Sequence, residues 1–270
     1  MGRFDNILIV SDIDNTFLAI GGGLVQKNID ALRYFLSEGG KFTFATGRVH
    51  ESLLNSIPIA SEIMSAPGIM ANGGYIYDFD SKTAFNCRYM DEEITRQIAE
   101  YIYDYNDEFG IRYSSSDCTA YCRLLPEYLG LREHSYRNAP LLSRDKWDFK
   151  NCCKIVVRGK SDKLDELRSE LEARFGDVVE LVKSGDTFLE VEAQGVTKGS
   201  AIDGLREYYK KRGINVKVYA CGDYENDISM LKEADVAVCP SNATYDVKEI
   251  ADLVLCSCSD GLISNLIERL

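Results

Sequence analysis

Residues 7–16 read ILIVSDIDNT, an apolar run that ends in two aspartates separated by one residue. A short apolar run followed directly by polar residues is typical of a strand buried in a parallel sheet. Side chains that follow such a strand lie at the edge where open α/β sheets bind their ligands. This stretch therefore predicts a buried strand and, at Asp12 and Asp14, the start of a candidate site.

The sequence on both sides of the insert described below alternates strands and helices. Residues 29–36 carry apolar side chains at helical spacing before Gly39-Gly40, residues 42–45 form a second apolar run, and a short helix is expected near 53–57. The elements expected after Gly195 are a helix over 198–211, strands over 216–220, 236–238 and 253–255, and a short helix over 227–233. This alternation predicts an α/β fold with a Rossmann-like parallel sheet.

The middle of the chain has a different character. It is rich in Tyr, Arg and acidic residues, and its strands look amphipathic and antiparallel. The elements expected there are amphipathic helices over 94–105 and 163–175 and strands over 153–158 and 188–192. We therefore predict an α+β domain inserted at residues 85–190 into a core formed by residues 1–84 and 191–270.

The composition excludes several classes of protein. The 270 residues include 43 acidic and 31 basic ones, a formal charge of −12, and 45% are apolar. Such a chain is globular and lacks the basic surplus that a nucleic-acid polymer binder needs. No apolar stretch is long enough for a membrane span or a signal peptide, so we expect a cytoplasmic protein. We also expect it to be a monomer or a homodimer. Its nine cysteines, an odd number, are expected to be reduced structural thiols.

Four motifs fall at the ends of predicted core strands, and each has a plain structural alternative. Asp12 and Asp14 could converge on a hard cation or simply cap a turn. Thr46-Gly47-Arg48 could bind an anion at a helix start, or Thr46 could be an ordinary helix cap. Lys198 lies near a helix start, where an anionic partner would explain its charge, although a solvated lysine is the alternative.

The fourth motif follows an apolar strand and reads GDYEND over residues 222–227. Asp223 could complete a carboxylate shell, and Asp227 lies one helical turn further on, facing the same way. A helix cap is again the plain alternative. The four motifs together favour a Mg²⁺ site that leaves positions open for water and a substrate phosphate.

At this point the chain resembles a known family, the haloacid dehalogenase superfamily, and within it the Cof-like phosphatases with a type IIB cap. The resemblance covers nearly the whole chain. It rests on residues 9–16, 45–48, 72–74, 195–199 and 221–231, with Asn242-Ala243 and Asp260-Gly261 near the end.

The resemblance implies a phosphatase that works through an aspartyl phosphate. Asp12 would be the nucleophile, and Asp14 would protonate the leaving oxygen and then activate water. Mg²⁺ would be held by Asp12, the Asp14 carbonyl and Asp223. The remaining implied roles are phosphate binding by Thr46, Gly47, Lys198 and Asn226, and support by Arg48 and Asp227, the latter orienting Lys198 or a metal-bound water. The insert would be a mobile cap that reads the rest of the substrate.

One departure concerns Asn15, which stands where the family usually has glycine. Asn tolerates a left-handed backbone, so the turn can be kept. Sucrose-phosphate phosphatases also resemble this chain in carrying Asp-x-Asp-Asn-Thr, the pattern of residues 12–16. This resemblance favours a sugar phosphate as the substrate, which we expect to be a small phosphorylated metabolite. Two alternatives remain open: a phosphomutase of the phosphomannomutase type, and a non-catalytic protein that binds a phosphorylated metabolite or Mg²⁺.

Overall fold

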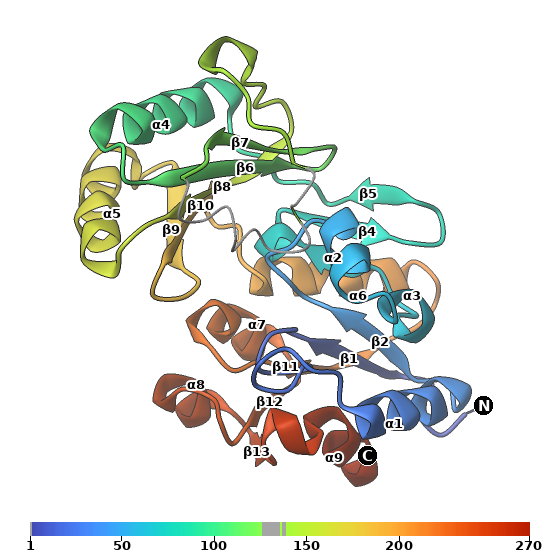
Figure 1. Cartoon of the computed structure of the whole chain (residues 1–270). Coiled ribbons are helices and arrows are strands. Elements are labelled where there is room, and N and C mark those ends of the chain that lie inside the picture. Colours follow the sequence, from blue (N-terminus) through green and yellow to red (C-terminus); the bar gives the residue numbers. More distant parts are fainter. Residues whose placement is uncertain (1, 126–135, 137–138) are drawn as a thin grey trace. The chain divides into compact units, whose positions relative to one another are not determined.

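The computed structural model describes residues 2–125, 136 and 139–270 (Figure 1). It divides into two compact units. The core unit extends to Gly47 and continues with Pro58–Asn86 and Thr197–Leu270, and the insert unit contains Arg48–Ile57 and Cys87–Val196. The sequence placed the insert at 85–190. The second crossing lies at 196/197 because the strand over Phe188–Ala193 pairs along its length within the insert sheet, and the grouping of residues 48–57 with the insert was not predicted.

The core unit is built on a five-stranded parallel sheet (Figure 1). Its strands, in spatial order, are β13 (Leu253–Leu255), β12 (Val236–Pro240), β11 (Lys217–Cys221), β1 (Ile7–Ser11) and β2 (Lys41–Phe44). The chain runs outward from β1 to β2 and then returns to the other side of β1 to form β11. The carboxyl ends of β1 and β11 therefore meet at the topological switch point, where such sheets bind ligands. The predicted α/β fold with a parallel sheet is confirmed.

Helices cover both faces of this sheet (Figure 1). On one face α1 (Gln26–Ser37) packs against α9 (Leu262–Arg269). On the other lie α6 (Ile202–Lys210), α7 (Ile228–Glu233) and α8 (Tyr245–Ile250), whose apolar side chains pack with Leu8 and Val10 of β1. The helices α1, α6 and α9 each bury an apolar stripe, and the shorter α7 and α8 bury one or two apolar side chains, so burial of nonpolar area stabilises this arrangement.

A smaller element of the core unit was not predicted. The strands β3 (Gly68–Met70), β4 (Tyr75–Asp78) and β5 (Thr83–Phe85) form a three-stranded antiparallel sheet. A single parallel bridge between Ala45 and Ile69 connects β3 to the end of β2. The short helix α3 (Ala60–Ile63) precedes β3.

The insert unit contains an antiparallel sheet with helices on one face (Figure 1). Its strands, in spatial order, are β7 (Thr119–Arg123), β6 (Gly110–Ser115), β8 (Cys152–Arg158), β10 (Phe188–Ala193) and β9 (Val179–Lys183). The helices α4 (Glu92–Tyr105) and α5 (Ser161–Phe175) bury Ile98, Ile102 and Leu167 against one face. The unit also contains α2 (His50–Ser56).

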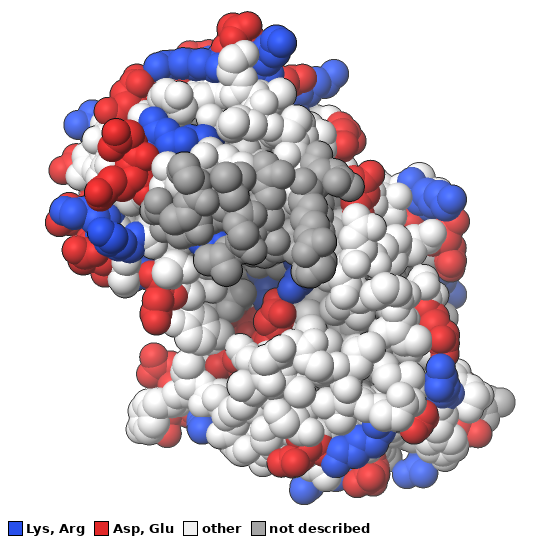
Figure 2. Space-filling model, in the orientation of Figure 1, with Lys and Arg blue, Asp and Glu red and all other residues white. Residues whose placement is uncertain are grey.

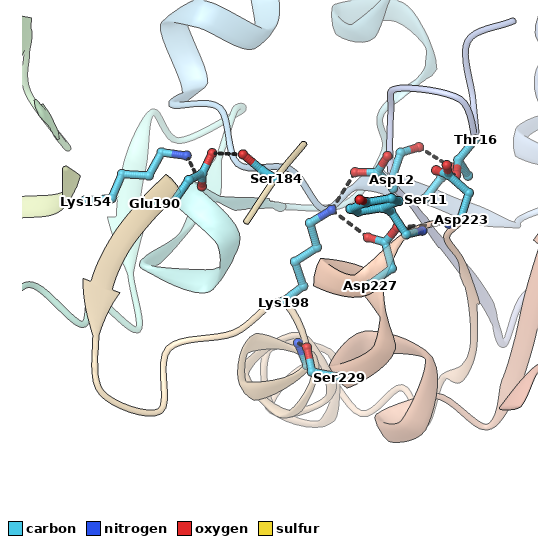
Figure 3. Close-up of polar contacts among 12 residues, drawn as sticks. Ser11, Asp12, Thr16, Lys154, Ser184, Glu190, Lys198, Asp223, Asp227 and Ser229 are labelled. Atoms are coloured by element: carbon cyan, nitrogen blue, oxygen red, sulfur yellow. Dashed lines mark hydrogen bonds and ion pairs between the residues drawn. The ribbon is translucent and has the colours of Figure 1, made fainter. Parts of the chain in front are cut away.

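Side chains alternate along each strand, so the residues between those that face the helices point to the opposite face of the sheet. That face carries buried charged side chains. Lys154 of β8 donates to Oε2 of Glu190 on β10 at 2.7 Å, and Ser184 donates to Oε1 at 2.8 Å (Figure 3). Burial alone would raise the pKa of Glu190, but Lys154 and these hydrogen bonds lower it below its usual value. Burial would likewise lower the pKa of Lys154, but Glu190 and Glu192 raise it. Both groups are therefore charged near neutral pH.

Replacing Glu190 with glutamine removes the nearest anion from the buried Lys154 ammonium. We expect the free energy of unfolding near neutral pH to fall by about 3 kcal/mol, because a buried charge then loses its closest partner. Since the folded-state pKa of Glu190 is lowered, its contribution is present above the unfolded-state pKa and is lost as the pH falls through the folded value. Denaturant unfolding of wild type and variant at several pH values measures both effects.

The control is Glu166→Gln, which removes the exposed partner of Lys163 on α5. Exposed ion pairs contribute little, so this variant should unfold within about 0.5 kcal/mol of wild type. The double variant Lys154→Met/Glu190→Gln should recover part of the loss. Equal stability of Glu190→Gln and Glu166→Gln would contradict the buried-pair assignment.

No helix within the described residues is long and apolar enough to cross a membrane. All nine cysteines lie among the described residues and are free thiols. Figure 2 shows acidic and basic side chains beside one another at several places on the drawn face, together with broad areas that carry neither.

Candidate active site

Asp12 lies at the switch point of the core sheet. Parallel pairing brings Ser11 beside Cys221, and the Asp12 amide continues the ladder by donating to the Cys221 carbonyl at 2.8 Å. Its carboxylate is 13% exposed. Strand β1 and Asp12, the first of the two predicted aspartates, are therefore positioned by the regular hydrogen bonding of β1 to β11.

The loop after β11 folds back on itself through Asp227. The Oδ2 atom of Asp227 accepts from the backbone amides of Asp223 at 2.9 Å and Tyr224 at 3.2 Å. Gly222 makes room for this contact, because a Cβ atom there would lie 2.4 Å from the Asp227 Cβ. Asp227 thus holds the loop that presents Asp223.

Lys198 is fully buried between two carboxylates. Its Nζ atom lies 2.5 Å from Oδ1 of Asp12 and 2.7 Å from Oδ1 of Asp227 (Figure 3). The backbone that carries it is held close to α7, since the Gly199 amide donates to Ser229 Oγ at 3.2 Å. A Cβ atom on Gly199 would come within 2.4 Å of the Ser229 carbonyl oxygen, so this approach requires glycine.

The two carboxylates that contact this lysine form a group with a third, Asp223. One oxygen from each of Asp12, Asp223 and Asp227 lies within 4.8 Å of the other two, a group that could hold a metal ion. Burial raises the pKa of Asp12 well above its usual value, against the opposing effect of Lys198. Burial and the nearby Asp227 also raise the pKa of Asp223, to about 6.

The electrostatics of the cluster favour a cation. Burial alone would lower the pKa of Lys198, but Asp12 and Asp227 hold it above its usual value. One ammonium therefore faces three largely buried carboxylates. Oxygen ligands of this kind suit a hard divalent cation, whose arrival would relieve their mutual repulsion. The residues fit a magnesium-type ion.

The other predicted site residues have different surroundings. Asp14 is exposed and follows Asp12 by two residues, and its side chain is not part of the three-carboxylate group. Thr46 is buried after β2, where its amide donates to the Ile69 carbonyl at 2.9 Å, and Gly47 follows it.

Asn226 is half-buried in the turn before Asp227. Arg48 belongs to the insert unit, where it donates to Ser56 Oγ at 2.7 Å.

Sequence reasoning gave Asp227 a supporting role and gave no role to Thr16. The structure adds the carboxylate of Asp227 to the group formed with Asp12 and Asp223. The spacing of Asp223 and Asp227 by one helical turn was the available signal. The Thr16 hydroxyl donates to Oδ1 of Asp223 at 2.6 Å, a contact between residues 207 positions apart that no local pattern could reveal.

Asn15 adopts the left-handed conformation expected for it, with φ of 56°. Its carbonyl accepts from Nδ2 of Asn242 at 3.0 Å. Asparagine pays less than most residues for this backbone conformation, so the turn between Asp14 and Thr16 is kept without glycine.

The chain is similar in sequence to known hydrolases. A family model described as haloacid dehalogenase-like hydrolase matches residues 9–267. The phosphatase YcsE of Bacillus subtilis, named for 5-amino-6-(5-phospho-D-ribitylamino)uracil, is 28% identical over 250 residues, covering 92% of this chain and 88% of the relative.

Two solved structures share the fold over nearly the whole chain. TM0651 of Thermotoga maritima gives a TM-score of 0.82 at 28% identity, covering 98% of this chain and 97% of the other. BT4131, described as a sugar phosphatase of subclass IIB, also gives 0.82, at 22% identity, with coverage of 97% and 98%. The second likeness shows the shared fold.

Proposed function

The chain belongs to the haloacid dehalogenase-like hydrolases, and from this premise we propose that it is a Mg²⁺-dependent phosphatase acting on a small phosphorylated metabolite, with a sugar phosphate as substrate. The expected membership in this superfamily, the Cof-like type and the phosphatase class of enzyme are confirmed. The observation that carries the proposal is the cluster of Asp12, Asp223 and Asp227 at the switch point of the sheet, where Asp12 and Asp227 also contact the buried Lys198.

We assign the phosphate and cation sites to the core unit. Asp12 and Asp223, with the Asp14 carbonyl, would hold Mg²⁺, and Asp227 would orient Lys198 or a metal-bound water. The bound ion would supply charge neutralisation for the phosphoryl group. Thr46, Gly47, Lys198 and Asn226 would bind phosphate oxygens.

The reaction proposed for these residues has two displacement steps. In the first, an Asp12 oxygen bonds to phosphorus, the bond from phosphorus to the ester oxygen breaks, and Asp14 gives its proton to the leaving alcohol. In the second, Asp14 takes a proton from water as the water oxygen bonds to phosphorus and the Asp12–phosphorus bond breaks. Lys198 stays protonated throughout and stabilises the charge on Asp12 and on the phosphoryl oxygens.

The substrate class is supported by the relatives, not by a ligand. YcsE carries the name of a phosphatase for a phosphorylated ribityl compound, and BT4131 is described as a sugar phosphatase. One name refers to a phosphorylated ribityl compound and the other to sugar phosphates. We propose the same class for this chain, handled in the cytoplasm.

Removing divalent cations tests the cofactor assignment. We expect hydrolysis of an aryl phosphate to fall at least 100-fold after chelation and to return when Mg²⁺ is restored, because the three carboxylates otherwise repel the phosphate. Calcium is the control, since its preference for more ligands at longer distances should give poor rescue. Full activity in the chelated, metal-free protein would contradict the assignment.

A panel of phosphorylated sugars, polyols, nucleotides and amino acids, ranked by kcat/KM, tests the substrate class. We expect the highest values for sugar or polyol monophosphates. Conversion of a hexose 1-phosphate to an isomer without release of inorganic phosphate would favour a phosphomutase instead. Tight binding of such compounds with no turnover would favour a non-catalytic binding protein.

A further inference from the structure

Thr16 completes the opening motif, yet the proposed reaction gives it no task. Its side chain is wholly buried, and its hydroxyl donates to Oδ1 of Asp223 at 2.6 Å (Figure 3). Asp223 is itself 7% exposed and belongs to the three-carboxylate group. The contact therefore joins the loop after β1 directly to the loop after β11.

We propose that Thr16 is a positioning residue that sets the orientation of the Asp223 carboxylate for binding a divalent cation. This inference rests on the proposed cation site and goes beyond it. A carboxylate at the end of a loop can adopt several side-chain rotamers, and each would place its oxygens differently. A short hydrogen bond from a fixed donor restricts Asp223 to one of them.

The donor is fixed by its neighbours in the chain. Before Thr16, Asn15 turns the backbone with a φ of 56°. After it, the amide of Phe17 donates to the Ile13 carbonyl at 3.1 Å. The Phe17 ring packs against Phe42 and Phe44 of β2, with centroid separations of 5.8 and 4.9 Å. Since threonine is also restricted at χ1, its hydroxyl has little freedom to leave Asp223.

The hydroxyl is also suited chemically to this task. It is a neutral donor, so it adds no charge that would compete with an incoming cation, as a second lysine would. Hydrogen bonds from an outer residue to a ligating carboxylate orient the ligand, and their loss typically weakens metal binding 10- to 100-fold. Thr16 thus complements Asp227, which holds the same loop through its backbone amides.

Direct titration of the full-length protein with Mg²⁺ alone, followed by calorimetry, tests the proposal without a substrate. We expect Thr16→Val, which keeps the shape and removes the hydroxyl, to raise the Kd for Mg²⁺ by about 10- to 100-fold. Thr16→Ser keeps the hydroxyl and should stay within about threefold of wild type. The Mg²⁺ concentration for half-maximal activity should shift in parallel, with a smaller change in KM for the substrate.

The matched control is Thr43→Val. Thr43 is also wholly buried in the core unit, and its hydroxyl donates to the Pro67 carbonyl at 3.0 Å, not to a carboxylate of the site. It should lose stability, as measured by thermal unfolding, while binding Mg²⁺ with the affinity of wild type. An unchanged Kd in Thr16→Val, or equal weakening in Thr43→Val, would overturn the positioning role.

The outcomes separate this inference from the proposed function. If wild type binds Mg²⁺ but hydrolyses no phosphate ester, while Thr16→Val still weakens binding, the inference stands and the proposed reaction fails. If wild type is an active phosphatase and Thr16→Val binds Mg²⁺ normally, the proposed reaction stands and the inference about Thr16 fails. Absence of Mg²⁺ binding by wild type would overturn both.

Discussion

Replacing Asp12 with asparagine is expected to lower the kcat for phosphate ester hydrolysis by about 10⁴-fold or more, a loss typical of removing a catalytic nucleophile. The amide keeps the size of the side chain but cannot attack phosphorus. Lys198 retains Asp227 at 2.7 Å, so the variant should still fold. Steady-state release of inorganic phosphate measures the first effect, and thermal unfolding measures the second.

Asp30→Asn is the control for this variant, because Asp30 is an exposed residue of α1 in the same unit. It should leave both kcat and stability close to wild type. Activity of Asp12→Asn within tenfold of wild type would remove Asp12 as the nucleophile, whatever its position in the fold.

Replacing Lys198 with methionine should affect both activity and stability. The buried ammonium lies 2.5 Å from Asp12 and 2.7 Å from Asp227, and its removal leaves these carboxylates without their shared cation. Breaking such a buried charge cluster typically costs about 3–5 kcal/mol. Loss of a preorganised cation at the reacting phosphate should also lower kcat about 10²- to 10³-fold.

Added Mg²⁺ should recover part of the lost stability of Lys198→Met, because a ligand that binds only the folded state stabilises it by mass action. The kcat should remain low, since an ion bound by the carboxylates cannot replace the ammonium at its own position. Lys210→Met, an exposed change on α6, serves as the control. A wild-type unfolding free energy for Lys198→Met in the absence of metal would contradict this account.

The fold could be predicted in outline because its buried strands are short apolar runs. Residues 7–10 and 216–220 read as strands from composition alone, and the parallel sheet has strands there, at Ile7–Ser11 and Lys217–Cys221. The hairpin of β4 and β5 was missed, since the exposed Thr83 and Ala84 give no apolar run to detect. The grouping of residues 48–57 with the insert depends on tertiary contacts that periodicity does not encode.

Part of the candidate site could be predicted from the sequence for a related reason. Asp12 and Asp223 follow strands that the sequence marks clearly, so parallel pairing of β1 with β11 was enough to bring them together. The contact from Thr16 to Asp223 depends on a side-chain direction set by the Asn15 turn. The buried Lys154–Glu190 pair depends on strand register within the insert. Neither can be read from one segment of sequence.

If Asp12 is the nucleophile, its side chain carries the phosphoryl group during turnover. Acid quenching of the wild-type enzyme during hydrolysis of an aryl phosphate with Mg²⁺, followed by peptide mass spectrometry, tests it most directly. We predict one phosphoryl group on the Asp12 side chain, formed during turnover and absent from Asp12→Asn. Rapid turnover with no such adduct, together with an adduct on another residue or an active Asp12→Asn, would contradict the account.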